Sequence, residues 1–139
     1  MSDGNAAAMI RLTVERITQT VEREVVSRAY RVSNVLRNSA IYTLRGPSPS
    51  PPGSPPGVRG GVFRNSWQPG VRIEKGGSGL RAVSQIENPI TVTGRSRTWV
   101  LGELLEEGTR KMAARPYQEK IKEHAKPEIE RIYSEPFNI

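Results

Sequence analysis

The first third of the chain has apolar residues at steps of three and four. They are Ile10, Val14, Ile17, Val21, Val25, Ala29, Val32, Leu36 and Ala40. This spacing places them on one stripe of a helix, which we expect to run from about Ala6 to Leu44 and to end at Gly46-Pro47. Because valine and isoleucine are weak helix formers, packing has to stabilise this helix. The stripe could pack on the chain's own sheet or form a seam between the helices of neighbouring subunits.

The segment that follows, residues 46–61, contains six prolines and five glycines. Proline lacks the backbone N–H and glycine is costly to order, so neither a helix nor a central strand can form here. We therefore predict an extended, polyproline-like loop or arm. Two interpretations stay open, a mobile surface loop and a segment that docks on a neighbouring ring of an assembly.

The middle of the chain predicts a β-hairpin. A strand is expected over 63–73, with Pro69 indicating a bulge or an edge position. Residues 75–79 are rich in glycine and read as a turn. The return strand, 80–87, alternates apolar and polar side chains, and 90–93 is a candidate third strand. The predicted hairpin thus has one apolar face and one mixed face.

Two helices are expected near the C-terminal end. The first covers Thr98 to Glu107, with Thr98 as its candidate cap and Gly108 as its stop. Pro116 suits the first position of the final helix, which we expect to reach Tyr133, with Pro127 kinking or splitting it. The side chains expected to be buried on this helix are Tyr117, Ile121, Ala125, Ile129 and Ile132.

These elements predict a single α+β domain, with a long N-terminal helix and a C-terminal helix packed on a small antiparallel β-sheet. Its parts are the long helix (6–44), the Pro/Gly-rich arm (46–61), the β-hairpin and sheet (62–93) and the C-terminal helices (98–134). A length of 139 residues fits one domain. Hydrophobic residues make up only 35% of the chain, below the usual share for globular proteins. A chain that buries so little by itself often relies on partner subunits.

The net charge of +7 is concentrated in the middle of the chain, where residues 46–99 hold seven basic and two acidic side chains. Such a field favours polyanions, including DNA, although an ordinary basic surface has the same composition. The segment lacks the signatures of sequence-specific readers. The candidates to face DNA are Arg72, Lys75, Arg81, Arg95 and Arg97. These side chains could equally pair with acids on neighbouring subunits.

The sequence offers little for catalysis. Its one histidine, His124, lies on the polar side of a predicted helix, and Glu106 and Glu107 are adjacent, so they point to different sides of a helix. There is no cysteine and Asp3 is the one aspartate, so neither a disulfide nor a metal site is expected. The glycines of 76–79 lack the Gly-Lys-Ser/Thr that a phosphate loop needs. We expect no enzyme, no cofactor, no secretory signal and no membrane span.

Two segments are more distinctive. The second of them along the chain runs Leu104-Leu105-Glu106-Glu107-Gly108-Thr109-Arg110-Lys111-Met112-Ala113-Ala114-Arg115-Pro116-Tyr117. The first runs Gly60-Gly61-Val62-Phe63-Arg64-Asn65-Ser66-Trp67. Together they resemble signatures of small tailed-phage proteins of the neck or tail-completion family, which join head to tail. That family tends to show Thr-Gly-x-Leu-Arg-x-Ser-apolar and, later, an acidic residue with Gly-Thr, Met-Ala and Arg-Pro-aromatic. Gly60 stands where the family usually has threonine.

The resemblance implies a structural virion protein at the head–tail junction, which joins the portal-connector complex to the tail. Its copies would form a homo-oligomeric ring of six or twelve, in contact with head-completion or connector proteins on one side and tail terminator or tail tube proteins on the other. Contact with the passing genome DNA would be transient. The protein would assemble in the host cytoplasm and end in the neck of the virion. The alternative is a non-specific, basic nucleic-acid-binding accessory protein.

Both motifs supply candidates for a subunit interface. They are Gly108, Thr109, Arg110, Lys111, Arg115 and Tyr117 of the later motif, with Arg64 and Trp67 of the earlier one. The basic side chains of the later motif could meet acids on an adjacent copy, such as Glu103, Glu106 and Glu107. In the competing interpretation, the turn between Gly108 and Tyr117 serves only the fold.

Overall fold

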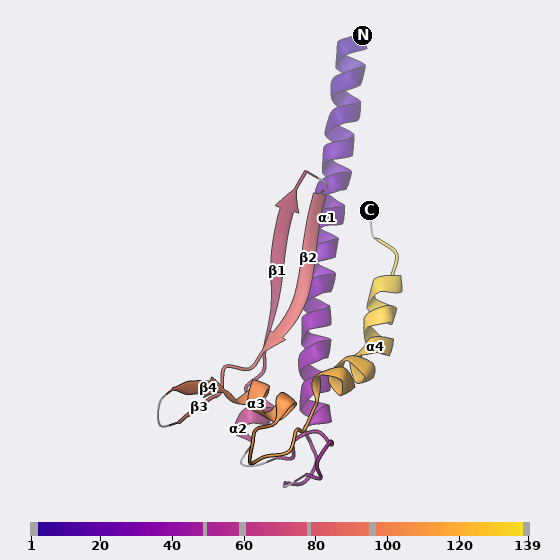
Figure 1. Cartoon of the computed structure of the whole chain (residues 1–139). Helices are drawn as coiled ribbons and strands as arrows, with labels where there is room; N and C mark the ends of the chain where they lie inside the picture. The colour runs from indigo at the N-terminus through magenta and orange to yellow at the C-terminus, as the bar shows by residue number, and fades with distance from the viewer. Residues whose placement is uncertain (1–2, 49, 59–60, 78, 95–96, 138–139) are drawn as a thin grey trace.

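The computed structural model describes residues 3–48, 50–58, 61–77, 79–94 and 97–137. One long helix, α1 (Asp3–Thr43), forms the axis of the molecule, and a β-hairpin and the C-terminal helix α4 (Gln118–Ser134) lie along different sides of it (Figure 1). The predicted α+β class, with two helices and small antiparallel sheets, is confirmed.

The apolar stripe of α1 is divided between a buried part and an exposed part. Its later positions, such as Ala29 and Val32, are buried, because the hairpin and α4 pack against this half of the helix. Its first positions, Ile10, Val14 and Ile17, are exposed. The N-terminal part of α1 extends beyond the hairpin (Figure 1). The chain's own sheet therefore covers only the later half of the stripe.

The hairpin consists of β1 (Gln68–Gly76) and β2 (Gly79–Glu87), which pair antiparallel from Gln68 opposite Glu87 to Gly76 opposite Gly79. The return strand forms where it was predicted, but its burial alternates only from Gly79 to Ala82, and residues 82–86 are all half-buried. Ser84 Oγ donates a hydrogen bond to the Ala29 carbonyl of α1 at 2.7 Å, and Ile86 packs on the core. Among the described strands β1 pairs with β2 alone, so Pro69 occupies the expected edge strand.

The start predicted for the first strand is wrong. Residues Val62–Asn65 form a short helical turn, α2, and the strand begins only at Gln68. Gly61 has a left-handed backbone (φ 79°) that turns the chain into α2. Phe63 and Trp67 are four positions apart, a helical spacing, and both join the core. Packing of these two rings thus decides the local structure against the alternating pattern.

The helix predicted to start at Thr98 begins later. β3 (Thr91–Thr93) pairs with β4 (Thr98–Val100) to form a small ribbon, and α3 (Leu101–Glu107) follows directly. The threonines and valines of these strands favour extended backbone. Trp99, which lies within the predicted helix, is instead exposed on the ribbon. The ribbon projects away from α1 (Figure 1).

The final helix also begins later than predicted, because Pro116 lies before it and Tyr117 is its N-cap. Pro127 lies inside α4 and does not split it, although the axis of the helix changes direction along its length (Figure 1). The burial expected for α4 is confirmed for Tyr117, Ile121, Ala125 and Ile132, whereas Ile129 is half-buried.

The described part of the Pro/Gly-rich segment is a loop, one of the two predicted forms, and it folds back on the body, so an arm that extends away from the body is wrong for these residues. Gly53 N–H donates to the Ala114 carbonyl at 3.0 Å, and Val58 N–H donates to the Gly46 carbonyl at 2.8 Å. A Cβ on Gly57 would lie 1.9 Å from the Pro47 carbonyl oxygen, so only glycine fits there.

Candidate functional site

The two distinctive sequence motifs meet in one aromatic cluster at the C-terminal end of α1. Phe63 and Trp67 come from the earlier motif and Tyr117 from the later one, fifty positions after Trp67. Their ring centroids lie 5.6 to 5.9 Å apart in edge-to-face geometry. Pairs of this kind contribute about 0.5–1.5 kcal/mol each beyond the area that they bury. The motifs therefore form one structural unit, with Ala40 and Leu44 of α1 packed against it.

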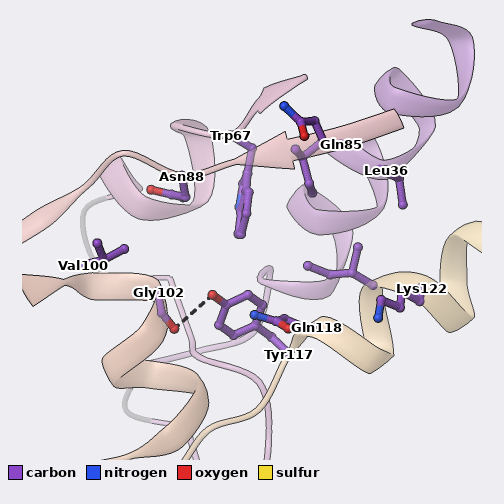
Figure 2. A pocket seen from close by; sticks show the side chains of 11 residues that line it. Leu36, Trp67, Gln85, Asn88, Val100, Gly102, Tyr117, Gln118 and Lys122 are labelled. Carbon is purple, nitrogen blue, oxygen red and sulfur yellow. Dashed lines mark hydrogen bonds between the residues drawn. The ribbon is translucent and has the colours of Figure 1, made fainter. Parts of the chain in front are cut away.

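Tyr117 links this cluster to α3. Its hydroxyl donates a hydrogen bond to the Gly102 carbonyl at 3.0 Å (Figure 2), and a Cβ on Gly102 would lie 2.6 Å from that hydroxyl oxygen. Burial, with a smaller contribution from the negative charge of Glu106, raises the pKa of Tyr117 to about 12. The phenol therefore stays protonated as a donor over the physiological range.

Glu106 connects α3 to the first turn of α4. Its Oε2 accepts the backbone N–H of Tyr117 at 2.7 Å and that of Gln118 at 3.3 Å. A carboxylate at this position satisfies amides that have no partner within the helix and interacts favourably with the helix dipole. The acid proposed as a contact for an adjacent copy thus has a role within its own chain.

The turn after α3 depends on Gly108 and Thr109. Gly108 has φ 78°, and a Cβ there would lie 2.7 Å from the Ala114 backbone nitrogen. Thr109 Oγ1 accepts the N–H groups of Lys111 and Met112 at 3.3 and 3.1 Å. The Gly-Thr pair of the motif therefore builds a tight turn, which supports the purely structural interpretation for these two residues.

Two candidate interface arginines bind carbonyl groups of their own chain. Arg64 Nε donates to the Ile41 carbonyl in the last turn of α1 at 2.8 Å, where helix carbonyls have no partner within the helix. Arg115 Nε donates to the Ser50 carbonyl of the folded-back loop at 3.1 Å. Sequence alone could not separate these uses from a subunit contact.

Of the eight interface candidates, six are thus engaged within the chain: Gly108, Thr109, Arg115, Tyr117, Arg64 and Trp67. The other two, Arg110 and Lys111, are exposed, and neither side chain has a hydrogen bond or ion pair to any residue that the structure describes. They stand next to each other on the outer side of the turn. They are the basic groups of the motif that remain available to a partner.

A pocket of about 410 Å³ opens beside the aromatic cluster. Figure 2 shows Trp67 and Tyr117 facing it from different elements, together with Leu36 of α1. The amide of Asn88 is already used, since Nδ2 donates to the Phe63 carbonyl at 2.8 Å and Oδ1 accepts the Ile90 N–H at 3.2 Å. The other polar side chains that line the pocket are Gln85, Gln118 and Lys122, so its lining is mixed.

The basic candidates for DNA contact do not form one patch. On the hairpin, Glu74 pairs with Arg72 at 3.1 Å and with Arg81 at 3.7 Å. Lys75 instead approaches Glu22 of α1 at 3.9 Å. Because these ion pairs are exposed to solvent, each contributes little free energy.

Arg97 directly precedes β4, with its guanidinium 3.2 Å from the ring centroid of Trp99. The β3–β4 ribbon lies at the other end of the hairpin from its tip (Figure 1). Arg95 lies outside the described residues. The candidates are therefore spread over two separate elements.

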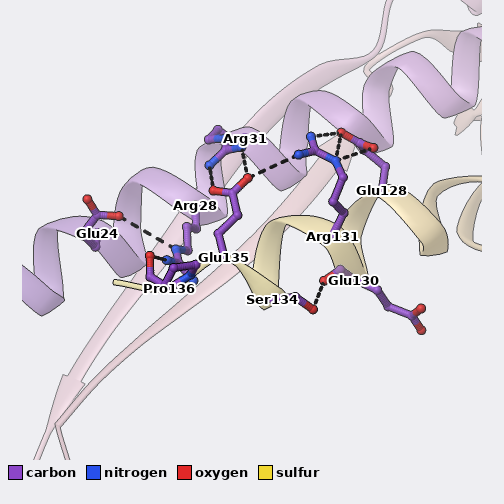
Figure 3. Close-up of polar contacts among 9 residues, drawn as sticks. All are labelled: Glu24, Arg28, Arg31, Glu128, Glu130, Arg131, Ser134, Glu135 and Pro136. Atoms are coloured by element: carbon purple, nitrogen blue, oxygen red, sulfur yellow. Dashed lines mark hydrogen bonds and ion pairs between the residues drawn. The ribbon is translucent and has the colours of Figure 1, made fainter. Parts of the chain in front are cut away.

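A cluster of polar contacts that no sequence pattern indicated joins the segment after α4 to α1 (Figure 3). Arg31 of α1 forms two hydrogen bonds with the Glu135 carboxylate, at 2.7 and 2.8 Å. These bonds lower the pKa of Glu135. Arg28, which is buried, donates to the Pro136 carbonyl at 2.9 Å and lies over the ring of Phe137. Only the folded chain brings these groups together.

His124 is exposed on α4, as expected, but it contacts α1. Its Nδ1 lies 3.0 Å from Ser39 Oγ, and its ring stacks on Tyr42 with a centroid distance of 4.0 Å. The guanidinium of Arg45 also lies over the Tyr42 ring, 3.5 Å from its centroid. The arrangement joins the two helices and has the geometry of a packing contact.

Among the residues that the structure describes, no three or more histidine, cysteine or acidic side chains gather as a metal site would require. Within the same residues, no helix is long and apolar enough to cross a membrane. Comparisons with protein-family models, with curated proteins and with solved structures found no match.

Proposed function

We propose that this chain is a structural protein of a tailed-phage particle, which forms a ring at the head–tail junction and joins the portal-connector complex to the tail. The observation that carries the proposal is the convergence of the two motifs. Trp67 and Tyr117 pack edge to face, with centroids 5.9 Å apart. Segments that resemble two signatures of one family are expected to meet in space if they belong to one fold, and here they share a core.

The exposed apolar surface supports an assembly role. Large apolar side chains are exposed at two distant places, the N-terminal part of α1 and the β3–β4 ribbon (Figure 1). On the ribbon these are Val92, Trp99 and Val100. Exposed apolar groups of this kind mark contacts with other proteins. A subunit that touches ring neighbours as well as the components above and below it needs several such surfaces.

The proposed partners follow from this position. The copies form a ring of six or twelve, the exposed Arg110–Lys111 turn contacts an adjacent subunit, and the ribbon reaches the neighbouring connector or tail protein. Arg97, which directly precedes β4, and the arginines of the hairpin would meet the passing genome only transiently.

Electron microscopy of lysates from a producer that lacks this gene tests the proposal. We expect full heads beside unattached tails, or tails of abnormal length, and complete particles once the intact gene is supplied in trans. Normal, complete particles without the gene would remove the head–tail assignment.

The second candidate is a non-specific nucleic-acid-binding accessory protein. The observation that favours it is Arg97 stacked on exposed Trp99, since an arginine and an aromatic ring together suit phosphate contact and base stacking. Retention of duplex DNA by the purified chain, with a steep dependence on salt, would support this candidate. Formation of rings at rising protein concentration without nucleic acid would support the neck protein instead.

A further inference from the structure

The N-terminal end of α1 has no support from the part of its own chain that the structure describes. The hairpin contacts α1 as far as Glu22, through Lys75, and reaches Gln19 at its tip. Before that point the helix projects alone (Figure 1). Three of its apolar side chains, Ile10, Leu12 and Val14, are 66%, 53% and 56% exposed.

This projecting segment is poorly suited to stand alone in water. Isolated helices of about 15 residues are marginal even in alanine-rich sequences. Here residues 13–21 include Thr13, Val14, Ile17, Thr18 and Val21, all β-branched and therefore weak helix formers. An external surface that covers the apolar side chains has to stabilise it.

Its apolar side chains form two ridges. The first consists of Ile10, Val14 and Ile17, and the second of Met9 and Leu12. With 3.6 residues per turn, the two ridges point in directions roughly 140° apart. In a closed ring of parallel helices, each helix meets its two neighbours in directions about 120° apart for six copies and about 150° for twelve. The angle between the two ridges thus suits a helix that packs between two neighbours better than a helix with a single contact in a dimer.

The charge of the segment favours a copy of itself over a polyanion. Residues 5–18 carry Arg11 and Arg16 against Glu15, a net charge of only +1 within a chain of +7. A helix that binds anionic lipid or DNA carries an excess of basic residues on its polar face. Segments with so little net charge can gather side by side with little mutual repulsion.

We propose that the projecting segments of adjacent copies, residues 5–18, pack as parallel helices into a bundle on one side of the ring. The Ile10 ridge of each copy contacts the Leu12 ridge of the next. The inference rests on the proposed ring and specifies one of its contacts, with a second copy of this chain as the occupant of each ridge.

Cross-linking of introduced thiols tests the contact, because these 139 residues contain no cysteine. Ile10 and Leu12 lie about 3 Å apart along the helix axis, so the variants Ile10→Cys and Leu12→Cys should form a mixed disulfide when combined. A chain with both changes should give a ladder of bands up to the ring size. Thr18→Cys, on the polar side of the helix, is the matched control and should stay monomeric on denaturing gels.

A charge in either ridge should weaken assembly. We expect Ile10→Glu and Leu12→Glu each to raise the concentration for half-assembly at least about tenfold, as measured by sedimentation. Thr18→Glu, which adds the same charge on the polar side, should have little effect. All three positions are exposed, so the thermal unfolding of the core should stay unchanged in every variant.

The outcomes separate this inference from the proposed function. Rings that form without cross-links, and that tolerate both ridge variants, would overturn the bundle and leave the neck proposal standing. A chain that stays monomeric at all concentrations would overturn both. Homodimers of Ile10→Cys alone, or binding of the wild-type chain to phosphatidylserine vesicles that is lost in Ile10→Glu, would also overturn the bundle.

Discussion

Glu106 of α3 accepts the backbone N–H of Tyr117 at 2.7 Å and so caps α4, eleven positions further along the chain. The contact closes the turn that contains Gly108, whose backbone only glycine adopts easily. Glu106, Gly108 and Tyr117 of the later motif therefore act together to set the position of α4 relative to α3.

Loss of this cap should destabilise the fold. We expect Glu106→Ala to lower the free energy of unfolding by about 1–2 kcal/mol, the usual cost of a lost N-terminal cap. Urea denaturation of the purified chain measures it. Glu107→Ala, which changes the adjacent exposed acid, is the control and should cost less than about 0.5 kcal/mol. Equal losses in the two variants would contradict the capping role.

Gly102 and Tyr117 should show strong coupling in a double-mutant cycle. Gly102→Ala places a Cβ 2.6 Å from the Tyr117 hydroxyl oxygen, so we expect a loss of about 1–3 kcal/mol from crowding. Tyr117→Phe should cost about 1 kcal/mol through its lost hydrogen bond. Because phenylalanine removes the clashing oxygen, Gly102→Ala should cost much less in that background. Additive losses would mean that the crowding arises elsewhere.

Tyr117 should also make stability fall at alkaline pH. Its pKa is raised from 10 to about 12 in the folded chain, so between these values the folded state binds more protons than the unfolded state. Stability contributed by the neutral phenol is therefore present below pH 10 and is lost as the pH rises towards 12. The urea midpoint of the wild type should fall relative to that of Tyr117→Phe over this range. A constant difference between the two would contradict the raised pKa.

The parts of the fold that were predicted well depend on local repeats. The 3.6-residue period of α1 and the alternation of β2 extend over enough positions to identify each element. The boundaries near Gly61 and Thr98 were wrong because they depend on distant partners. Phe63 and Trp67 favour a helical turn only because Tyr117 and α1 provide a core for them, and β4 is a strand because β3 is available to pair with it.

The candidate site shows the same limit. Residue type and spacing identified the motif around Gly108 correctly as a turn, but could not show which cations the fold uses. Arg115 binds the Ser50 carbonyl, 65 positions earlier, whereas Arg110 in the same turn stays exposed. The contact between Arg31 and Glu135 joins residues 104 positions apart and has no local signal.

Acid should loosen the C-terminal end. The hydrogen bonds from Arg31 hold the pKa of Glu135 below its ordinary value of 4.5, so the stabilisation is present above that value and is lost as the pH falls through the lowered pKa. Glu135→Gln should therefore melt at a lower temperature than the wild type at pH 7, with the difference shrinking near pH 3. Glu130→Gln, in the longer exposed pair with Lys126, is the control and should give a small difference that changes little.

The exposed Arg110–Lys111 pair should matter for assembly and not for folding. Arg110→Glu with Lys111→Glu should leave thermal unfolding unchanged, because both side chains are exposed and neither forms a hydrogen bond or ion pair with a described residue. The double variant should nevertheless raise the concentration for ring formation at least about tenfold through repulsion from acids of the adjacent copy. Lys120→Glu with Lys126→Glu makes the same change in net charge on α4 and is the matched control. Adding Glu103→Lys and Glu107→Lys to the first double variant should restore assembly. Glu106 stays unchanged in this variant because it caps α4. Sedimentation velocity measures all three, and unchanged rings in the first variant would remove these two residues from the interface.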